Sequence, residues 1–157
     1  SPKIAGLSSW YLERQLKNFK AGIRGADPKD KYGMQMRPMA LTLPDDQAIA
    51  DMAAYVASMA EKKVAPSVGG DANAGKAAYM LCQACHGPTG GGNKALNSPK
   101  LAGQQDWYLV RQIKNFKAGI RGVKPGDAYG AQMRPMAMTL ANDKAINNVA
   151  AYIATLK

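Results

Sequence analysis

The stretch MLCQACHGPTG, residues 80–90, contains both cysteines and the only histidine of the 157-residue chain. Cys82, Cys85 and His86 therefore lie within five residues of one another. A disulfide between these cysteines would close a loop too short to stabilise a fold much. A structural zinc site needs four ligands, and cysteine and histidine supply three here. A thioredoxin-like redox pair would accompany a βαβ pattern, which the chain lacks.

The remaining interpretation of the CxxCH pattern is covalent attachment of haem. The two thiols can add to the two haem vinyl groups, and the histidine that follows can bind the iron as an axial ligand. Electron-transfer haems of this type usually take a methionine sulfur from farther along the chain as the second axial ligand. The segment AQMRPMAMTL, about fifty residues after His86, supplies Met133, Met136 and Met138. We expect one of them to bind iron and two to pack in the core.

Met133 is the expected iron ligand, with Met136 as the alternative. Both have a methionine counterpart in the first half of the chain, whereas the counterpart of Met138 is Leu41. Pro135 predicts that this methionine segment is a loop rather than a regular helix, because proline lacks the amide donor that a helix interior uses.

The chain contains an internal repeat. SPKIAG at residues 1–6 returns as SPKLAG at 98–103, and at this offset of 97 the first 60 residues align with the last 60 without a gap. Identical residues occupy 38 of the 60 aligned positions, including KNFKAGIRG and QMRPMA. The sequence therefore predicts a first repeat over 1–60, a linker over 61–70 and a second repeat over 71–157. The first repeat has no counterpart of the segment that carries the CxxCH.

Both repeats are predicted to be helical, and no stretch alternates as a strand does. In WYLVRQIKNFKAG (107–119) apolar residues recur every three positions, with Asp106 placed to cap the start and the final glycine to end the helix. NDKAINNVAAYIATLK (142–157) predicts an amphipathic terminal helix capped by its first residue. DANAGKAAYMLCQACH (71–86) predicts a helix capped by its aspartate, with the cysteines in its last turn.

The chain is strongly basic. Its formal net charge is +10, from 21 lysines and arginines against 11 acidic residues, which favours acidic or anionic partners. The basic residues form no nucleic-acid motif and are spread over both repeats. No apolar run approaches the roughly 18 residues of a membrane span. Arg121 and Lys100 are expected on the solvated surface, with a position near the haem propionates as the alternative. The lysines on the first helix of each repeat are either a solvated face or a docking patch: Lys17, Lys20, Lys114 and Lys117.

Several segments together carry a family resemblance: GKAAYMLCQACHGPTG, PKLAGQ, YLVRQIKNFKAG, the MRPM sequence and the final AAYI. With them the chain resembles class I cytochromes c, most closely the bacterial two-haem cytochrome c4 type. The resemblance covers the whole chain. It implies an all-α fold of two tandem class I cytochrome c domains, of which the first lacks its N-terminal haem-attachment segment in this chain.

The resemblance also implies a set of site residues. It predicts haem c attached through Cys82 and Cys85, with His86 as axial ligand and the Pro99 carbonyl orienting that histidine. In the family the first methionine of the loop binds iron, which corresponds to Met133 in the second repeat and to Met36 in the first. The family's first and last helices cross through small and aromatic residues, which correspond to Gly75, Tyr79 and Tyr152.

The implied function is electron transfer rather than enzyme catalysis. The resemblance predicts a soluble carrier in the bacterial periplasm that passes single electrons from a quinol-oxidising complex to an acceptor such as a terminal oxidase, through partners with acidic docking surfaces. Association with a membrane complex is compatible with this role. The alternatives are an electron-accepting haem subunit of a dehydrogenase, a haem that reacts with a small ligand such as peroxide, and a one-haem carrier whose first repeat is a docking module.

The first repeat raises a further expectation. It keeps QMRPMA at 35–40 as fully as the second repeat does, and an unfilled haem cavity would cost several kcal/mol of packing. We therefore expect the chain to be an incomplete record of a two-haem protein with a second CxxCH upstream and Met36 as its iron ligand. The alternatives are a one-haem chain with a partly unfolded first repeat, and a repeat completed by another chain.

Overall fold

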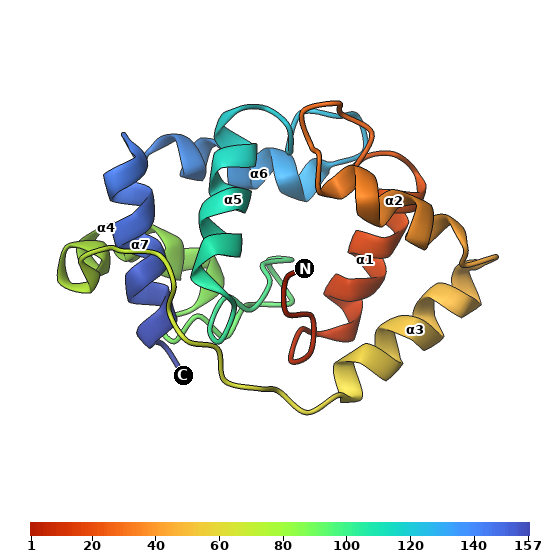
Figure 1. Ribbon diagram of the computed structural model, residues 1–157, viewed down its shortest axis with the longest axis horizontal. Coiled ribbons are helices and arrows are strands. Elements are labelled where there is room, and N and C mark those ends of the chain that lie inside the picture. The colour runs from red at the N-terminus through yellow and green to blue at the C-terminus, as the bar shows by residue number, and fades with distance from the viewer.

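The computed structural model describes all 157 residues, and it confirms the all-α prediction. The first repeat forms three helices and the second forms four, with the linker running between α3 and α4 along one edge of the molecule (Figure 1). None of these helices has the length and apolar character needed to span a bilayer. The helices are α1 (Ser9–Lys20), α2 (Gly33–Leu41), α3 (Asp46–Ser58), α4 (Ala72–His86), α5 (Asp106–Lys117), α6 (Ala128–Met138) and α7 (Asp143–Thr155).

Helix α4 carries the CxxCH in its last turns, as predicted. Its start is capped by Asp71, whose Oδ1 accepts hydrogen bonds from the amides of Asn73 at 2.8 Å and Ala74 at 3.2 Å. Its end is set by Gly87, which has a φ of 80°, a left-handed value that glycine adopts without steric cost. The chain can therefore turn sharply after His86, the last helical residue.

Helices α4 and α7 cross in close contact, which is the crossing that the resemblance predicted. A Cβ atom built on Gly75 would lie 1.9 Å from the Asn148 carbonyl oxygen, so only glycine fits there. Four residues later, the Tyr79 ring packs against the Tyr152 ring with centroids 5.3 Å apart. This crossing joins the CxxCH helix to the core of the second repeat. The buried members of that core are Tyr79, Leu109, Ile113, Phe116, Ala137, Leu140, Ile146, Val149, Ala150 and Ile153.

Asp106 does not cap α5, contrary to the prediction. Gln105 occupies the N-cap position, and Asp106 is the first helical residue. The Asp106 carboxylate instead accepts hydrogen bonds from the linker, from Ser67 N at 2.6 Å, Ser67 Oγ at 2.8 Å and Val68 N at 2.8 Å. It also accepts one from Trp107 N at 2.7 Å. Because Asp106 is 1% exposed, these contacts fix the linker to the start of α5.

Replacing Asp106 with asparagine is expected to lower the free energy of unfolding by about 2 kcal/mol, because buried hydrogen bonds to a charged acceptor are lost. Burial alone would raise the pKa of Asp106, but the hydrogen bonds from Val68, Ser67 and Trp107 lower it below its ordinary value of 3.8. The stabilisation is therefore present above pH 3.8 and is lost as the pH falls through the lower folded value.

Urea unfolding of the wild type and Asp106→Asn at pH 7 and in acid measures this effect. The exposed Asp143, replaced by asparagine, is the control and is expected to change stability by less than about 1 kcal/mol, because it holds only an exposed pair with Lys114. A stability difference between wild type and Asp106→Asn that stayed constant down to pH 2 would contradict the role given to the carboxylate.

The methionine segment of each repeat is a helix, which corrects the predicted loop. Pro135 lies inside α6 and Pro38 inside α2. The proline removes one amide donor only, and the start of α6 is secured by Asp127, which accepts hydrogen bonds from Gly130 N at 3.1 Å and Gly122 N at 3.0 Å. Local capping and core burial of Ala137 thus outweigh the local penalty of the proline.

Two arginines connect the repeats through reciprocal hydrogen bonds. Arg24 donates to Gln15 Oε1 at 2.6 Å in its own repeat and to Gln112 Oε1 at 3.3 Å in the other. Arg121, the counterpart of Arg24, donates to Gln112 at 2.6 Å and to Gln15 at 3.4 Å. Both arginines are buried. The solvated surface expected for Arg121 is therefore wrong, because its partner Gln15 belongs to the other repeat.

A second reciprocal contact involves arginines over tyrosine rings. The Arg14 guanidinium lies 4.7 Å from the ring centroid of Tyr129, and the Arg111 guanidinium lies 3.8 Å from that of Tyr32. Arg14 and Arg111 are counterparts, as are Tyr32 and Tyr129. Each repeat thus places one arginine on the other repeat's tyrosine, where cation–π attraction holds the two together.

The lysines of α1 and α5 make local structural contacts. Lys17 pairs with Asp46 at 3.0 Å, and Lys114 pairs with Asp143 at 2.6 Å. Lys20 and Lys117 donate to main-chain carbonyls at Leu43 and Leu140, respectively. All four lysines thus contact the segment around the start of the last helix of their repeat.

Candidate haem site

The largest cavity of the molecule lies at the junction of the repeats and has a volume of about 780 Å³. Hydrophobic residues make up 29 of its 50 lining residues, so its wall suits a large apolar group. The two cysteines and the histidine of the CxxCH pattern line it, from the end of α4. Met133 of α6 and Met36 of α2 line the same cavity. The fold therefore brings the predicted iron ligands of both repeats to one space.

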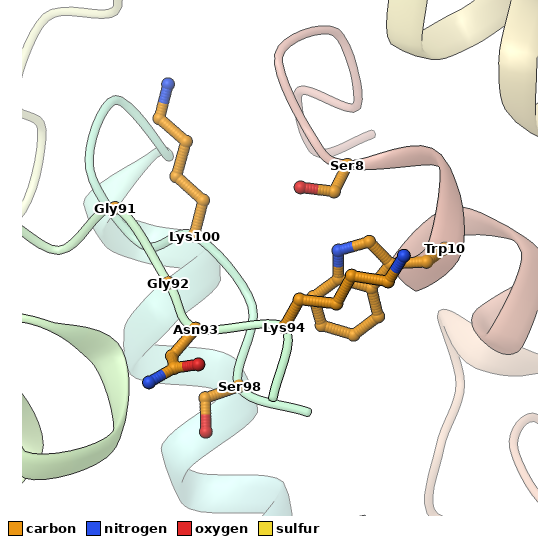
Figure 2. Close-up of a pocket in the computed structure, with 8 residues that line it drawn as sticks. All are labelled: Ser8, Trp10, Gly91, Gly92, Asn93, Lys94, Ser98 and Lys100. Atoms are coloured by element: carbon orange, nitrogen blue, oxygen red, sulfur yellow. The ribbon is translucent and has the colours of Figure 1, made fainter. Parts of the chain in front are cut away.

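A second pocket is too small and too polar for such a group. Its volume is about 100 Å³, and only one of its eight lining residues is hydrophobic. Figure 2 shows the first repeat's Trp10 beside Lys94 and the glycine-rich loop of the second repeat, with Lys100 extending away from them. Lys100 pairs with Glu61 at 2.7 Å, so it is held by an ion pair at the surface. This pocket marks where α1 meets the loop that follows the CxxCH.

His86 is held in an orientation suited to metal binding. It is 7% exposed, and its Nδ1 lies 2.8 Å from the Pro99 carbonyl oxygen. Because a carbonyl can only accept, Nδ1 carries the proton and Nε2 keeps its lone pair. Burial lowers the pKa of His86 below its ordinary value, although the Pro99 hydrogen bond acts in the opposite direction. The imidazole is therefore neutral at pH 7, which is the form that binds iron.

The two cysteines lie on consecutive turns of α4 and form no disulfide with each other. Cys82 is partly buried, packed against the core of the second repeat, whereas Cys85 is exposed. Burial raises the pKa of the Cys82 thiol. Both thiols line the large cavity, as attachment to a group inside it requires.

The three methionines of α6 differ in their position relative to the cavity. Met133 is partly buried and packs against the core of the second repeat. Met136 also lines the cavity but is 41% exposed, and Met138 is 53% exposed and does not line it. Met133 is thus the least exposed of the methionines that line the cavity with His86. In the first repeat, Met36 lines the cavity and is 37% exposed.

Two buried arginines belong to the cavity wall: Arg121, for which a place near the haem propionates was the alternative expectation, and Arg24, which the sequence analysis missed. Arg24 and Arg121 line the cavity, and the Nε atom of each is buried without a hydrogen-bond partner. An unpaired buried donor on a cation favours an anionic acceptor such as a carboxylate. The sequence feature that could have indicated these arginines is the run KNFKAGIRG, which is identical in both repeats and includes each arginine.

The residues at the cavity fit a haem. Apolar walls suit the macrocycle, a neutral imidazole and a thioether suit iron, and the buried guanidinium groups suit the propionate carboxylates. An all-α repeat with a CxxCH at the end of a helix and a methionine facing the same cavity defines the class of c-type haem proteins. The cytochrome c family model matches residues 72–157, and the chain belongs to this family.

Known proteins resemble the chain over nearly its whole length. Cytochrome c4 from Azotobacter vinelandii is 32% identical, over 97% of this chain and 75% of that protein. A "thiosulfate dehydrogenase electron acceptor" from Stutzerimonas stutzeri (strain A1501) is 31% identical, over 99% of this chain and 70% of that protein. The solved structure of cytochrome c4 from Acidithiobacillus ferrooxidans has a TM-score of 0.79 and 27% identity, over 99% of this chain and 88% of that one.

These findings support the family resemblance read from the sequence. The chain is similar to cytochrome c4, and its fold matches a cytochrome c4 structure. It is a cytochrome c4-like electron-transfer cytochrome with covalently bound haem c, and it acts as an electron carrier rather than an enzyme.

Proposed function

We propose that the second repeat binds haem c through Cys82 and Cys85, with His86 and Met133 as axial ligands, and carries one electron at a time. The observation that supports this most directly is that His86 and Met133 face one apolar cavity while Pro99 holds the imidazole in its neutral tautomer. Bound haem supplies the one-electron couple between ferric and ferrous iron.

The protein fixes the two residues that would hold the iron. A neutral nitrogen and a neutral thioether bind both states, and the thioether favours the ferrous state. His86 ends α4, which is fixed to α7 by the Gly75 crossing, and Met133 packs against the same core. Both side chains are therefore held by the protein itself and would need little rearrangement between the two oxidation states of a bound haem.

We further propose that Met36 is the ligand of a second haem in the complete two-haem protein. Met36 lies in α2 as Met133 lies in α6, and it lines the same cavity. Tyr55 of α3, the counterpart of Tyr152, is 66% exposed on the face that α4 covers in the second repeat. An exposed tyrosine at the position of a helix crossing supports a covering helix for α3. The division into repeats at 1–60 and 71–157 belongs to this proposal.

Haem content of the native protein tests the two-haem proposal. A pyridine haemochrome assay is expected to give two haems per chain, and intact-mass spectrometry is expected to give a mass larger than these 157 residues and two haems account for. One haem per chain, with a mass equal to these residues plus one haem, would contradict it and favour a one-haem carrier whose first repeat is a docking module.

The donor and acceptor belong to the same proposal. We place the protein in the bacterial periplasm, between a quinol-oxidising complex and a terminal oxidase, and its net charge of +10 favours acidic docking surfaces on these partners. A second candidate is supported by the relative named as a thiosulfate dehydrogenase electron acceptor. Stopped-flow reduction of the ferric protein by each type of donor distinguishes the two, since only the physiological donor should give fast, salt-dependent reduction.

A further inference from the structure

Arg14 of the first repeat reaches into the loop that orients the second repeat's histidine. Its Nη2 donates to the Asn97 carbonyl oxygen at 2.9 Å, and its Nη1 donates to Asn97 Oδ1 at 3.3 Å. Asn97 has a φ of 55° and is the only residue other than glycine with a positive φ. Residues other than glycine seldom adopt this left-handed conformation, and asparagine does so most readily, so contacts to its main chain and side chain add to its stability. The paired donors of Arg14 are such contacts.

Asn97 lies two residues before Pro99, whose carbonyl is the hydrogen-bond partner of His86. Asn97 is followed by Ser98, which exchanges two main-chain hydrogen bonds with Asn93, at 2.8 and 2.9 Å. The next residue is Pro99, whose carbonyl accepts from His86. Because Asn97 closes this small bridged loop, the direction of the Pro99 carbonyl depends on the Asn97 conformation. Arg14 is therefore connected to the histidine side of the haem site through the main chain.

The same guanidinium contacts the methionine side. Arg14 lies over the Tyr129 ring of α6, and Tyr129 precedes Met133 by four residues, about one helical turn. The aromatic rings of Trp10 and Tyr11, with centroids 5.0 and 5.3 Å away, hold the guanidinium from the first repeat. One side chain thus touches the loop of one axial ligand and the helix of the other.

We propose that Arg14 is a positioning residue that holds both sides of the second repeat's haem site from across the repeat junction. The inference rests on the proposed function, because it assumes that His86 and Met133 bind the iron. It assigns the first repeat a direct part in the ligand geometry of the second.

Competition between Met133 and added imidazole for the iron tests this proposal on the native haem-containing protein. Loss of supporting contacts around metal ligands typically weakens binding by about 10-fold or more. Arg14→Gln is therefore expected to raise the affinity for imidazole about 10-fold at the haem bound by His86. NMR spectra of the ferric protein resolve the methyl protons of each haem separately. The change in imidazole affinity can therefore be assigned to one haem.

Arg111→Gln is the matched control. It removes the same charge from the wall of the same cavity, but Arg111 contacts Tyr32 and Trp107 rather than Asn97 and Tyr129. We expect parental imidazole affinity at the His86 haem in this variant.

Arg14→Lys tests whether the positive charge of Arg14 or the geometry of its hydrogen bonds matters. It also replaces Arg14→Gln if that variant does not fold. Lysine keeps the charge without the paired planar donors, so we expect it to behave like glutamine. Parental affinity in Arg14→Gln and Arg14→Lys, or equal changes in Arg14→Gln and Arg111→Gln, would overturn the proposal. A parent without a methionine-ligated haem would instead contradict the proposed function, and its spectrum is measured before any variant is compared.

Discussion

Replacing Met133 with alanine is expected to abolish the low-spin, methionine-ligated spectrum of the second repeat's haem. Alanine has no sulfur, so water or hydroxide takes the sixth position and the ferric state gains stability relative to the ferrous state. We expect the reduction potential to fall by on the order of 0.1 V or more, since axial ligands strongly influence haem potentials. Absorption spectra of the ferric protein and a potentiometric titration measure both effects.

Two neighbouring methionines serve as controls for Met133→Ala. Met138→Ala should leave spectrum and potential unchanged, because Met138 does not line the cavity and is 53% exposed. Met136→Ala should also keep the methionine-ligated spectrum. An unchanged spectrum in Met133→Ala together with its loss in Met136→Ala would transfer the role of ligand to Met136.

Replacing Gly75 with alanine is expected to cost about 3 kcal/mol of unfolding free energy. The added Cβ would lie 1.9 Å from the Asn148 carbonyl oxygen and 3.0 Å from Tyr152 Cβ, so the main chains of α4 and α7 must move apart. This penalty exceeds the roughly 1 kcal/mol by which alanine is the better helix former. Because α4 carries the CxxCH, we also expect the His86 contact with Pro99 to weaken.

Gly69→Ala is the matched control for Gly75→Ala. A Cβ at Gly69 meets nothing within 4 Å, so its effect on stability should stay below about 0.5 kcal/mol. Urea unfolding of the three proteins at equal haem content measures the difference. Equal stability of Gly75→Ala and the wild type would contradict the close crossing of α4 and α7.

The local features of the fold could be predicted because short-range chemistry controls them. Asp71 and Asn142 were expected to cap α4 and α7, and both accept the amide hydrogen bonds of a cap. The spacing within Cys82–His86 indicated haem attachment because thiols and imidazole must stand on adjacent turns. In each case the interacting groups are separated by a few residues, so the pattern of the sequence already contains the geometry.

Features that depend on distant partners were missed or wrong. Asp106 was expected to cap its own helix, but its carboxylate binds Ser67, which is 39 residues away. Pro135 was expected to break a helix, yet α6 continues through it because core packing outweighs one missing hydrogen bond. The helix or capping propensity of a residue describes its average behaviour over many proteins. Asp106 and Pro135 depart from that average because specific tertiary contacts act on them.

The sequence alone therefore showed the duplication, and it predicted the helices α4, α5 and α7 and a set of candidate haem residues. The tertiary structure added how the repeats are joined. Arg121 is buried because Gln15, 106 residues away, accepts from it, and Arg14 binds Asn97 over a separation of 83 residues. Such pairs leave no periodic or short-range signal, because they form only once both repeats have folded and face each other. The packing of the helices, rather than spacing along the chain, determines which residues Arg121 and Arg14 contact.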